Sequence, residues 1–181
     1  MSDSAVRVRS ALPLLLAALA ALAGPRAVRA DAPVAVGSPA PALVLPQLDG
    51  QVFDLHALRG HVVIVNFWAT WCAPCRAEMP RLDAFYRRYH ARGVELIGVS
   101  VDDKDDAPAV AKVMKSFSYP AGLAANARSN GFGPPVAVPM TWIIDARGAI
   151  RERLLARLLQ DRTTDRQRVR LRQYAFAGIR R

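Results

Sequence analysis

The stretch Val62–Pro80, VVIVNFWATWCAPCRAEMP, is predicted to form a buried strand, a turn and a helix in succession, and the rest of the expected fold is built around it. Its first part, Val62–Phe67, is an almost unbroken apolar and β-branched run, which is typical of a strand covered on both faces. Cys72 and Cys75, the only cysteines of the chain, stand at the start of a helix predicted over Ala73–Tyr89. Residues three positions apart on a first helical turn are neighbours, so the two sulfurs are predicted to be adjacent.

The two sulfurs are expected to have different roles. Cys72 lies where free backbone N–H groups and the positive end of the helix dipole favour a thiolate, so we expect its pKa to fall below that of an ordinary cysteine. It is therefore the predicted attacking sulfur. Cys75, one turn further in, is placed to attack the mixed disulfide on Cys72, which releases a reduced partner and closes the disulfide. Pro74 fits a first turn, where it has no N–H to lose, whereas Pro80 is expected to kink the helix.

Two other uses of a cysteine pair agree less well with the sequence. A structural disulfide stabilises more the longer the loop that it closes, and this loop is too short to contribute much. A zinc site needs about four ligands, whereas His56, His61 and His90 are scattered and there is no second cysteine pair. The sequence therefore predicts a redox pair and no metal site.

The motif and a second stretch resemble one known family. The residues that carry the resemblance are NFWATWCAPC at 66–75, Glu78, Pro80 and Val138-Pro139. They are similar to the TlpA/ResA-like thiol-disulfide reductases, exported bacterial proteins of the thioredoxin fold. The resemblance runs from about Val36 to Arg151. It implies an α/β thioredoxin-like fold, with a central mixed β-sheet flanked by helices and an N-terminal β-hairpin. It also implies a reductase of cysteines in exported proteins, such as apocytochrome c or copper-site proteins.

The resemblance also implies roles for residues around the cysteine pair. Pro139 would be a cis-proline facing the pair, and the Val138 backbone would be free to bind an extended substrate segment. Trp71 and Pro74 flank the sulfurs and are predicted to contact substrate. Glu78, one turn beyond the second cysteine on the same side of the helix, is predicted to accept or return a proton during thiol exchange. Its alternative is an ordinary solvated glutamate. No cofactor is expected beyond the redox-active disulfide.

The formal net charge of +10 comes from the two ends of the chain. Residues 31–150 hold eight Arg and three Lys against eleven acidic residues, so the domain itself is neutral and no nucleic-acid partner is indicated. Residues 1–30 are predicted to be a signal peptide, with Arg7 and Arg9 before an apolar core of 13 residues and a small-residue cleavage site before Asp31. An uncleaved membrane anchor is the alternative, although a span needs roughly 17 to 25 residues.

Export has consequences for the partners. It would place the cysteines in the periplasm, where a lone pair becomes oxidised unless a donor re-reduces it. A membrane electron donor is therefore implied, beside clients that are cysteine-containing exported proteins. The thioredoxin-like domain is predicted over residues 31–160 as a monomer, and the arginine-rich tail 161–181 is predicted to be poorly ordered.

Other elements are expected around the motif. The acidic run 102–106 is expected to be solvated and to complement the dipole of the helix after it, rather than to bind calcium. Four leucines, at 154, 155, 158 and 159, are expected to form the inner face of a closing helix. The remaining predicted elements are a β-hairpin of 42–45 and 51–55, a strand over 94–101, a helix over 107–117, a short helix near 124–128, and a last antiparallel strand over 149–153.

Three other functions use related folds. A copper-delivery metallochaperone is expected to have three residues between its cysteines, one more than here. A peroxidase of the peroxiredoxin group has its attacking cysteine after a Thr-x-x pattern, but Thr70 lies only two positions before Cys72. A disulfide-forming oxidase shares the Cys-x-x-Cys pair and differs chiefly in reduction potential, which covers about −270 to −120 mV among such proteins. Copper delivery and disulfide formation remain the alternatives to reduction.

Overall fold

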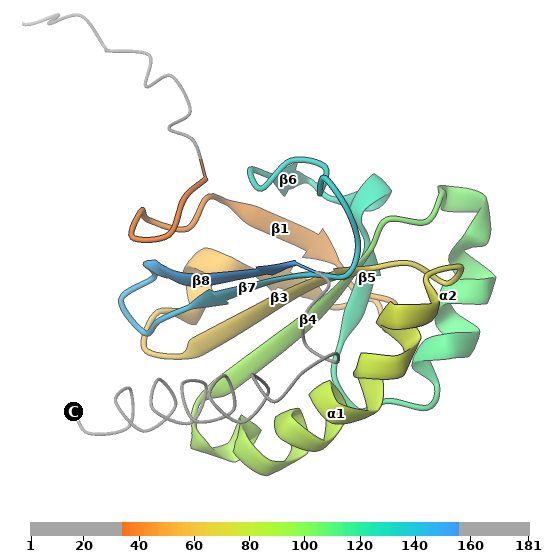
Figure 1. Cartoon of the computed structure of the whole chain (residues 1–181), viewed down its shortest axis with the longest axis horizontal. Helices are drawn as coiled ribbons and strands as arrows, with labels where there is room; N and C mark the ends of the chain where they lie inside the picture. The colour runs from red at the N-terminus through yellow and green to blue at the C-terminus, as the bar shows by residue number, and fades with distance from the viewer. Residues whose placement is uncertain (1–33, 156–181) are drawn as a thin grey trace, which may run out of the picture. The chain divides into compact units, whose positions relative to one another are not determined.

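The strand predicted at the start of the motif lies at the centre of a five-stranded sheet in the computed structural model, which describes residues 34–155 (Figure 1). This strand, β3 (Val62–Trp68), pairs in parallel with β4 (Val94–Ser100) and antiparallel with β7 (Met140–Ile144). Because β7 is antiparallel to β3, the first residue of β7 lies beside the end of β3, where Met140 pairs with Phe67. The carboxyl end of β3 and the amino end of β7 therefore lie next to each other, at the same end of these two strands.

The outer strands complete this sheet, and a second, smaller sheet packs against one of its faces. The order in the five-stranded sheet is β5-β4-β3-β7-β8, with β5 (Ala121–Leu123) and β8 (Ile150–Leu155) at its edges. The second sheet has the order β2-β1-β6, from β1 (Leu43–Pro46), β2 (Val52–Asp54) and β6 (Ser129–Asn130). The strands β1 and β2 are antiparallel and form the predicted hairpin. The two-residue strand β6 was not predicted, since a strand this short has no recognisable alternation.

Two helices cover one face of the larger sheet (Figure 1). The helix α1 (Ala73–Tyr89) has the predicted bounds and continues through Pro80. The helix α2 (Ala107–Met114) ends three residues before the predicted end at Phe117. It ends early because the last two residues of that range donate to carbonyls three positions back, which tightens the helix into a turn.

Alternation along β3 sends its side chains into two cores. Ile64 and Trp68 pack with the helices, whereas Val63 and Phe67 pack with the small sheet. All seven residues of β3 are buried, as predicted for a strand covered on both faces. Asn66 follows the same alternation and points toward the helices, so a polar side chain lies in the core beneath α1.

The leucines near the end of the described chain do not form a closing helix. Leu154 and Leu155 belong to β8, where they lie opposite Thr141 and Met140 of β7. The expectation that these two leucines line a helix is therefore wrong. The last strand was predicted to end at residue 153, but β7 still offers unpaired backbone groups beyond that point. Residues 154 and 155 pair with them and extend β8.

Several predictions concern residues that the structure does not describe. The signal peptide or anchor at 1–30, the tail 161–181, and the helix-face positions Leu158 and Leu159 all lie outside the described residues. The domain limits at 31 and 160 remain predictions for the same reason. Within residues 34–155, no helix has both the length and the apolar character needed to cross a membrane.

A buried carboxylate connects α1 to the segment after α2. Asp83, which is 3 % exposed, accepts hydrogen bonds from the backbone N–H and the hydroxyl of Ser118, at 2.6 and 2.7 Å. It also pairs with the exposed Arg87 at 3.2 Å. Ser118 itself is exposed, so it is the buried carboxylate of Asp83 that depends on these two hydrogen bonds. The ion pair with Arg87 is in contact with water.

We expect Asp83→Ala to lower the free energy of unfolding by about 1 to 3 kcal/mol, because it removes two hydrogen bonds to a buried, charged acceptor. Arg87→Ala removes only the exposed partner and is expected to cost less than about 1 kcal/mol. Equilibrium unfolding in urea measures both values. Equal losses in the two variants would show that the ion pair, and not the Ser118 hydrogen bonds, accounts for the stabilisation.

Candidate active site

The turn between β3 and α1 brings the two cysteines together at the carboxyl end of a central strand. The sulfurs of Cys72 and Cys75 are joined in a disulfide, with their Cα atoms 5.3 Å apart, so the predicted adjacency is confirmed. Cys72 is the residue that caps the start of α1, and its Sγ accepts a hydrogen bond from the Cys75 backbone N–H at 3.2 Å. This N–H belongs to the free donors of the first helical turn, which are the groups expected to stabilise a thiolate.

The two sulfurs differ in their access to solvent. Cys75 is fully buried, whereas Cys72 is 4 % exposed and lies between exposed neighbours. Trp71 is 71 % exposed and Pro74 is also exposed, so these two residues form the outer rim of the pair. A partner sulfur can approach Cys72 past this rim but has no path to Cys75. The more accessible sulfur is thus that of Cys72, which agrees with the attacking role predicted for Cys72 and the resolving role predicted for Cys75.

The predicted cis-proline lies in the loop that leads into β7. The peptide bond between Val138 and Pro139 is cis, Pro139 is buried and Val138 is half-buried. A groove of about 600 Å³ runs beside this loop, and both Val138 and Trp71 line it. The structure therefore brings together two of the residues that were predicted to contact substrate.

The groove, which we call the Trp71 groove, is mostly apolar. Its lining residues are Trp71, Val101, Asp102, Asp103, Ala124, Ala125, Asn130 and the run 133–138. None of them is basic, and Asp103 is exposed. A groove of this kind suits an extended, largely apolar chain segment.

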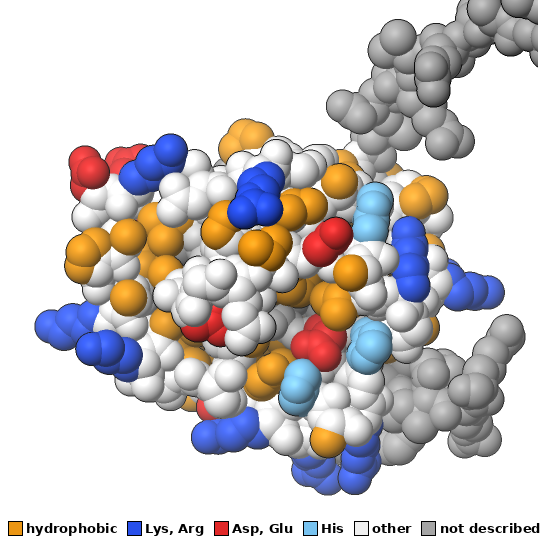
Figure 2. Space-filling view, turned by 180° about the vertical axis from the view of Figure 1, so that it is seen from behind, with side chains coloured by type: hydrophobic (Ala, Val, Ile, Leu, Met, Phe, Trp, Pro, Cys, Tyr) orange, Lys and Arg blue, Asp and Glu red, His pale blue; other side chains and the backbone are white. Residues whose placement is uncertain are grey.

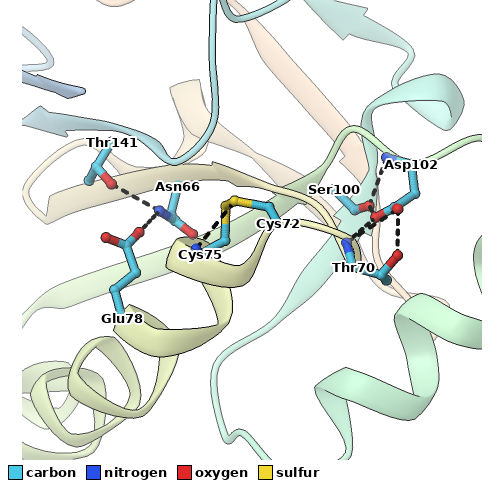
Figure 3. The surroundings of a disulfide bond; sticks show 8 residues. All are labelled: Asn66, Thr70, Cys72, Cys75, Glu78, Ser100, Asp102 and Thr141. Carbon is cyan, nitrogen blue, oxygen red and sulfur yellow. Dashed lines mark hydrogen bonds between the residues drawn. A yellow bond between two sulfur atoms is a disulfide. The ribbon is translucent and has the colours of Figure 1, made fainter. Parts of the chain in front are cut away.

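A buried polar triad lies on one side of the disulfide (Figure 3). Asn66 donates one hydrogen bond from its side-chain amide to Glu78 Oε1 and another to Thr141 Oγ1, both at 2.9 Å. Asn66 and Thr141 are direct partners on β3 and β7, and Glu78 reaches them from α1. Glu78 is only 2 % exposed, so the alternative of a solvated glutamate is excluded.

The surroundings of Glu78 favour its neutral form. Burial raises the pKa of Glu78 from 4.5 to about 7, and the hydrogen bond from Asn66 opposes this rise only in part. Near neutral pH the carboxyl group is therefore able both to accept and to return a proton. This property fits the role predicted for Glu78 during thiol exchange.

A second buried network lies on the other side of the disulfide (Figure 3). Asp102 is 3 % exposed, and its carboxylate accepts hydrogen bonds from the Thr70 N–H and hydroxyl and from the Ser100 hydroxyl. The expectation that the whole acidic run is solvated is therefore wrong for its first member. Asp102 follows directly on a buried strand, and partners from the neighbouring loop satisfy it there. The next four residues, 103–106, are exposed as expected.

Sequence reasoning assigned no role to Asn66, Thr141, Thr70 and Ser100. A buried hydrogen bond of Asn66 could have been predicted, because a polar residue within a strand that is buried on both faces needs a partner inside the protein. Thr141 and Ser100 become significant only through strand register and loop placement. Among residues 34–155, no three His, Cys, Asp or Glu side chains are grouped so that they could hold a metal ion.

Comparison with known proteins gives consistent results. A sequence model described as the AhpC/TSA family matches residues 36–153. The chain is 35 % identical over 146 residues to the thiol-disulfide oxidoreductase ResA of Geobacillus thermodenitrificans (strain NG80-2), an alignment that covers 78 % of this chain and 81 % of that protein. It is 32 % identical over 123 residues to ResA of Bacillus anthracis, over 66 % of this chain and 69 % of that protein.

Solved structures share the fold. A thiol:disulfide interchange protein of the thioredoxin family from Chlorobium tepidum TLS matches with a TM-score of 0.62 and 27 % identity, over 78 % of this chain and 98 % of that one. A thioredoxin-like protein from Porphyromonas gingivalis matches with a TM-score of 0.60 over 80 % of this chain and 96 % of that one. At 23 % identity this second likeness shows the fold alone. The predicted thioredoxin-like fold is confirmed.

We expect the stability of the oxidised protein to depend on the ionisation of Glu78. Its folded pKa is raised above 4.5, so its contribution is fully present below about pH 4.5 and is lost as the pH rises through about 7. The loss amounts to at most about 3.5 kcal/mol, because the two pKa values differ by about 2.5 and one pKa unit corresponds to about 1.4 kcal/mol. The matched variant Glu78→Gln keeps the shape of the side chain and is expected to lack this pH dependence.

Urea unfolding of the wild type and of Glu78→Gln, measured at several pH values from about 4.5 to 8.5, checks this expectation. All other titrating groups are common to both proteins, so the difference between the two curves isolates Glu78. Curves that run parallel over the whole range would contradict a raised pKa for this carboxyl group.

Proposed function

The chain belongs to the AhpC/TSA family and is a thiol-disulfide oxidoreductase of the ResA type, and from this premise we propose that it is an exported reductase of protein cysteines. The observation that carries the proposal is the placement of Cys72. Its sulfur caps α1 and accepts the Cys75 N–H, and the residue before it in the chain, Trp71, is exposed and lines the Trp71 groove.

The proposed reaction begins with both cysteines reduced. The Cys72 thiolate attacks one sulfur of a client disulfide, so a new sulfur–sulfur bond forms while the client bond breaks and its second sulfur leaves as a thiolate that takes up a proton. The Cys75 thiol then gives its proton to a base and attacks Cys72 Sγ. This step forms the Cys72–Cys75 bond and breaks the bond between Cys72 and the client, whose sulfur leaves as a thiolate and takes up a proton. The client is released as a dithiol, so two electrons pass from enzyme to client.

Glu78 is the base that we assign to the second step. It lies one turn beyond Cys75 on α1, and its raised pKa of about 7 makes proton uptake by its carboxylate feasible near neutral pH. The surroundings are closed to bulk water, because Cys75 and Glu78 are both buried. A proton leaving Cys75 therefore needs an acceptor inside the protein.

The charges around Cys72 support the reducing direction. Stabilising the thiolate of an attacking cysteine stabilises the reduced form and makes the pair more oxidising. Among the described residues, one backbone N–H, that of Cys75, donates to Cys72 Sγ. The Trp71 groove has no basic lining residue and contains the exposed Asp103. We infer a moderate stabilisation of the thiolate, and hence a reducing pair.

The clients that we propose are exported proteins with cysteines, such as apocytochrome c or copper-site proteins. Figure 2 shows one face of the protein, on which acidic, basic and hydrophobic side chains are interspersed. Such a face has no basic stripe of the kind that binds a nucleic-acid backbone. The proposal places the protein in the periplasm, directed there by residues 1–30, and includes a membrane electron donor that re-reduces the pair after each turnover.

The reduction potential of the Cys72–Cys75 pair tests the direction of electron flow. We expect a value closer to about −270 mV than to about −120 mV. Equilibration of the full-length protein with glutathione or dithiothreitol buffers, followed by alkylation of free thiols and mass spectrometry, measures it. A potential near −120 mV would overturn the proposal and make the protein a donor of disulfides.

The roles of the two sulfurs are tested with single-cysteine variants. We expect reduced Cys75→Ala to accumulate a mixed disulfide with a disulfide-bonded model client such as insulin, because the resolving sulfur is missing. Cys72→Ala is expected to form little or none, since its remaining sulfur is buried. Non-reducing electrophoresis separates the adducts. If Cys72→Ala were the variant that accumulates the adduct, the two roles would be reversed.

A further inference from the structure

Asp102 is a buried carboxylate that the thiol exchange described above does not use. It is 3 % exposed, and no Lys, Arg or His forms an ion pair with it among the described residues. A buried charge without a cation is costly unless hydrogen bonds replace its hydration. Here the donors come from two neighbouring segments. One is Thr70 in the turn of residues 69–72, which we call the cysteine turn, and the other is Ser100 at the end of β4.

Most of the hydrogen bonds that Asp102 accepts come from one residue of the cysteine turn, Thr70. The Thr70 N–H lies 2.9 Å from Asp102 Oδ2 and 3.2 Å from Oδ1, and the Thr70 hydroxyl lies 2.7 Å from Oδ1. The Ser100 hydroxyl donates to Oδ2 at 2.6 Å, and the Asp102 N–H donates back to it at 3.1 Å. The Asp102 carboxylate is thus held by Ser100 at the end of β4 and in turn binds Thr70 of the cysteine turn.

Thr70 occupies a sensitive place in that turn. The Cys72 N–H donates to the Ala69 carbonyl at 3.2 Å, so Thr70 lies inside a closed turn that ends at the attacking sulfur. The turn is also tied to β4 by the Val101 N–H, which donates to the Trp68 carbonyl at 2.9 Å. The orientation of Cys72 at the start of α1 therefore depends on where Thr70 is held.

We propose that Asp102 is a positioning residue, which binds Thr70 and thereby keeps the Cys72 sulfur in place to accept the Cys75 N–H. The inference rests on the proposed function, because the placement of Cys72 matters only if its sulfur attacks. Loss of the Asp102–Thr70 contact loosens the turn and weakens the hydrogen bond to Sγ. The thiolate of Cys72 then loses part of its stabilisation, and Cys72 reacts more slowly at neutral pH.

A carboxylate near a thiolate has a second possible effect, and its sign is opposite. Through space, the negative charge of Asp102 disfavours the Cys72 thiolate, so removal of the charge alone lowers the pKa of Cys72. Removal of a positioning contact raises this pKa. The direction of the change therefore separates the two explanations, and a purely structural role of Asp102 changes stability without either effect.

The experiment measures the pKa of Cys72 in the reduced full-length protein, from the pH dependence of its alkylation by iodoacetamide. The variants are Asp102→Ala, Asp102→Asn, Thr70→Val and Asp105→Ala. Asp102→Asn keeps one acceptor oxygen without the charge, and Thr70→Val removes the hydroxyl while keeping the backbone N–H. Asp105→Ala is the control, because it removes an exposed carboxylate from the same acidic segment.

We expect Asp102→Ala and Thr70→Val to raise the pKa of Cys72 by about half a unit or more, which lowers the thiolate fraction at neutral pH about threefold. Asp102→Asn is expected to give a smaller rise, and Asp105→Ala none. A fall in the pKa in both Asp102 variants would overturn the proposal in favour of a through-space charge effect. Unchanged values in Asp102→Ala and Thr70→Val would also overturn it, however much these variants lose in stability toward urea.

Two features keep the test decisive. If Asp102→Ala does not fold, Thr70→Val carries the measurement, and an unchanged pKa in that variant overturns the proposal. The alkylation assay needs no client protein, so its failure leaves the proposed reductase function standing. Conversely, a reduction potential near that of a disulfide donor would overturn the proposed function without altering the pKa differences among these variants.

Discussion

Burial of β3 on both faces is the constraint on which the rest of the structure depends. The strand has neighbours on both sides and a hydrophobic core above and below it, so its polar side chains depend on partners within the protein. The side-chain NH2 group of Asn66 finds two acceptors, in Glu78 of α1 and Thr141 of β7, whereas its Oδ1 has no hydrogen-bond partner among the described residues. A single buried amide thus connects the helix that carries the cysteines to the strand that follows the cis-proline.

The disulfide lies between two networks with different tasks. On one side, Glu78 is buried and forms no ion pair within residues 34–155, and its burial raises its pKa to about 7. On the other side, Asp102 is equally buried, but it accepts hydrogen bonds from three donors, which are the Thr70 N–H and the hydroxyls of Thr70 and Ser100. A carboxyl group with few donors suits proton transfer, and one with many donors suits the fixing of a turn. The same chemical group therefore serves chemistry or geometry according to its hydrogen bonds.

The central part of this arrangement could be predicted from the sequence, because it is local. The apolar run of β3, the helix after Cys72 and the adjacency of the sulfurs all follow from residues within one short stretch. The cis form of the Val138-Pro139 bond came from the resemblance and not from any physical signal in the chain. The Thr70–Asp102 contact joins residues far apart in sequence, so an acidic residue after a strand was taken for a solvated one. Such contacts depend on strand order, which alternation within each strand does not reveal.

Strand register gives the protein two regions with different tolerance to change in length. Asn66 and Thr141 lie directly opposite each other, and a shift of one residue in either strand would turn one of them to the opposite face. The catalytic half of the molecule is therefore intolerant of insertions and deletions. The loops that line the Trp71 groove, at 124–125 and 133–138, connect strands and can vary in length without moving that pair. Changes in the length of these loops can thus reshape the Trp71 groove while the Asn66–Thr141 pair stays in place.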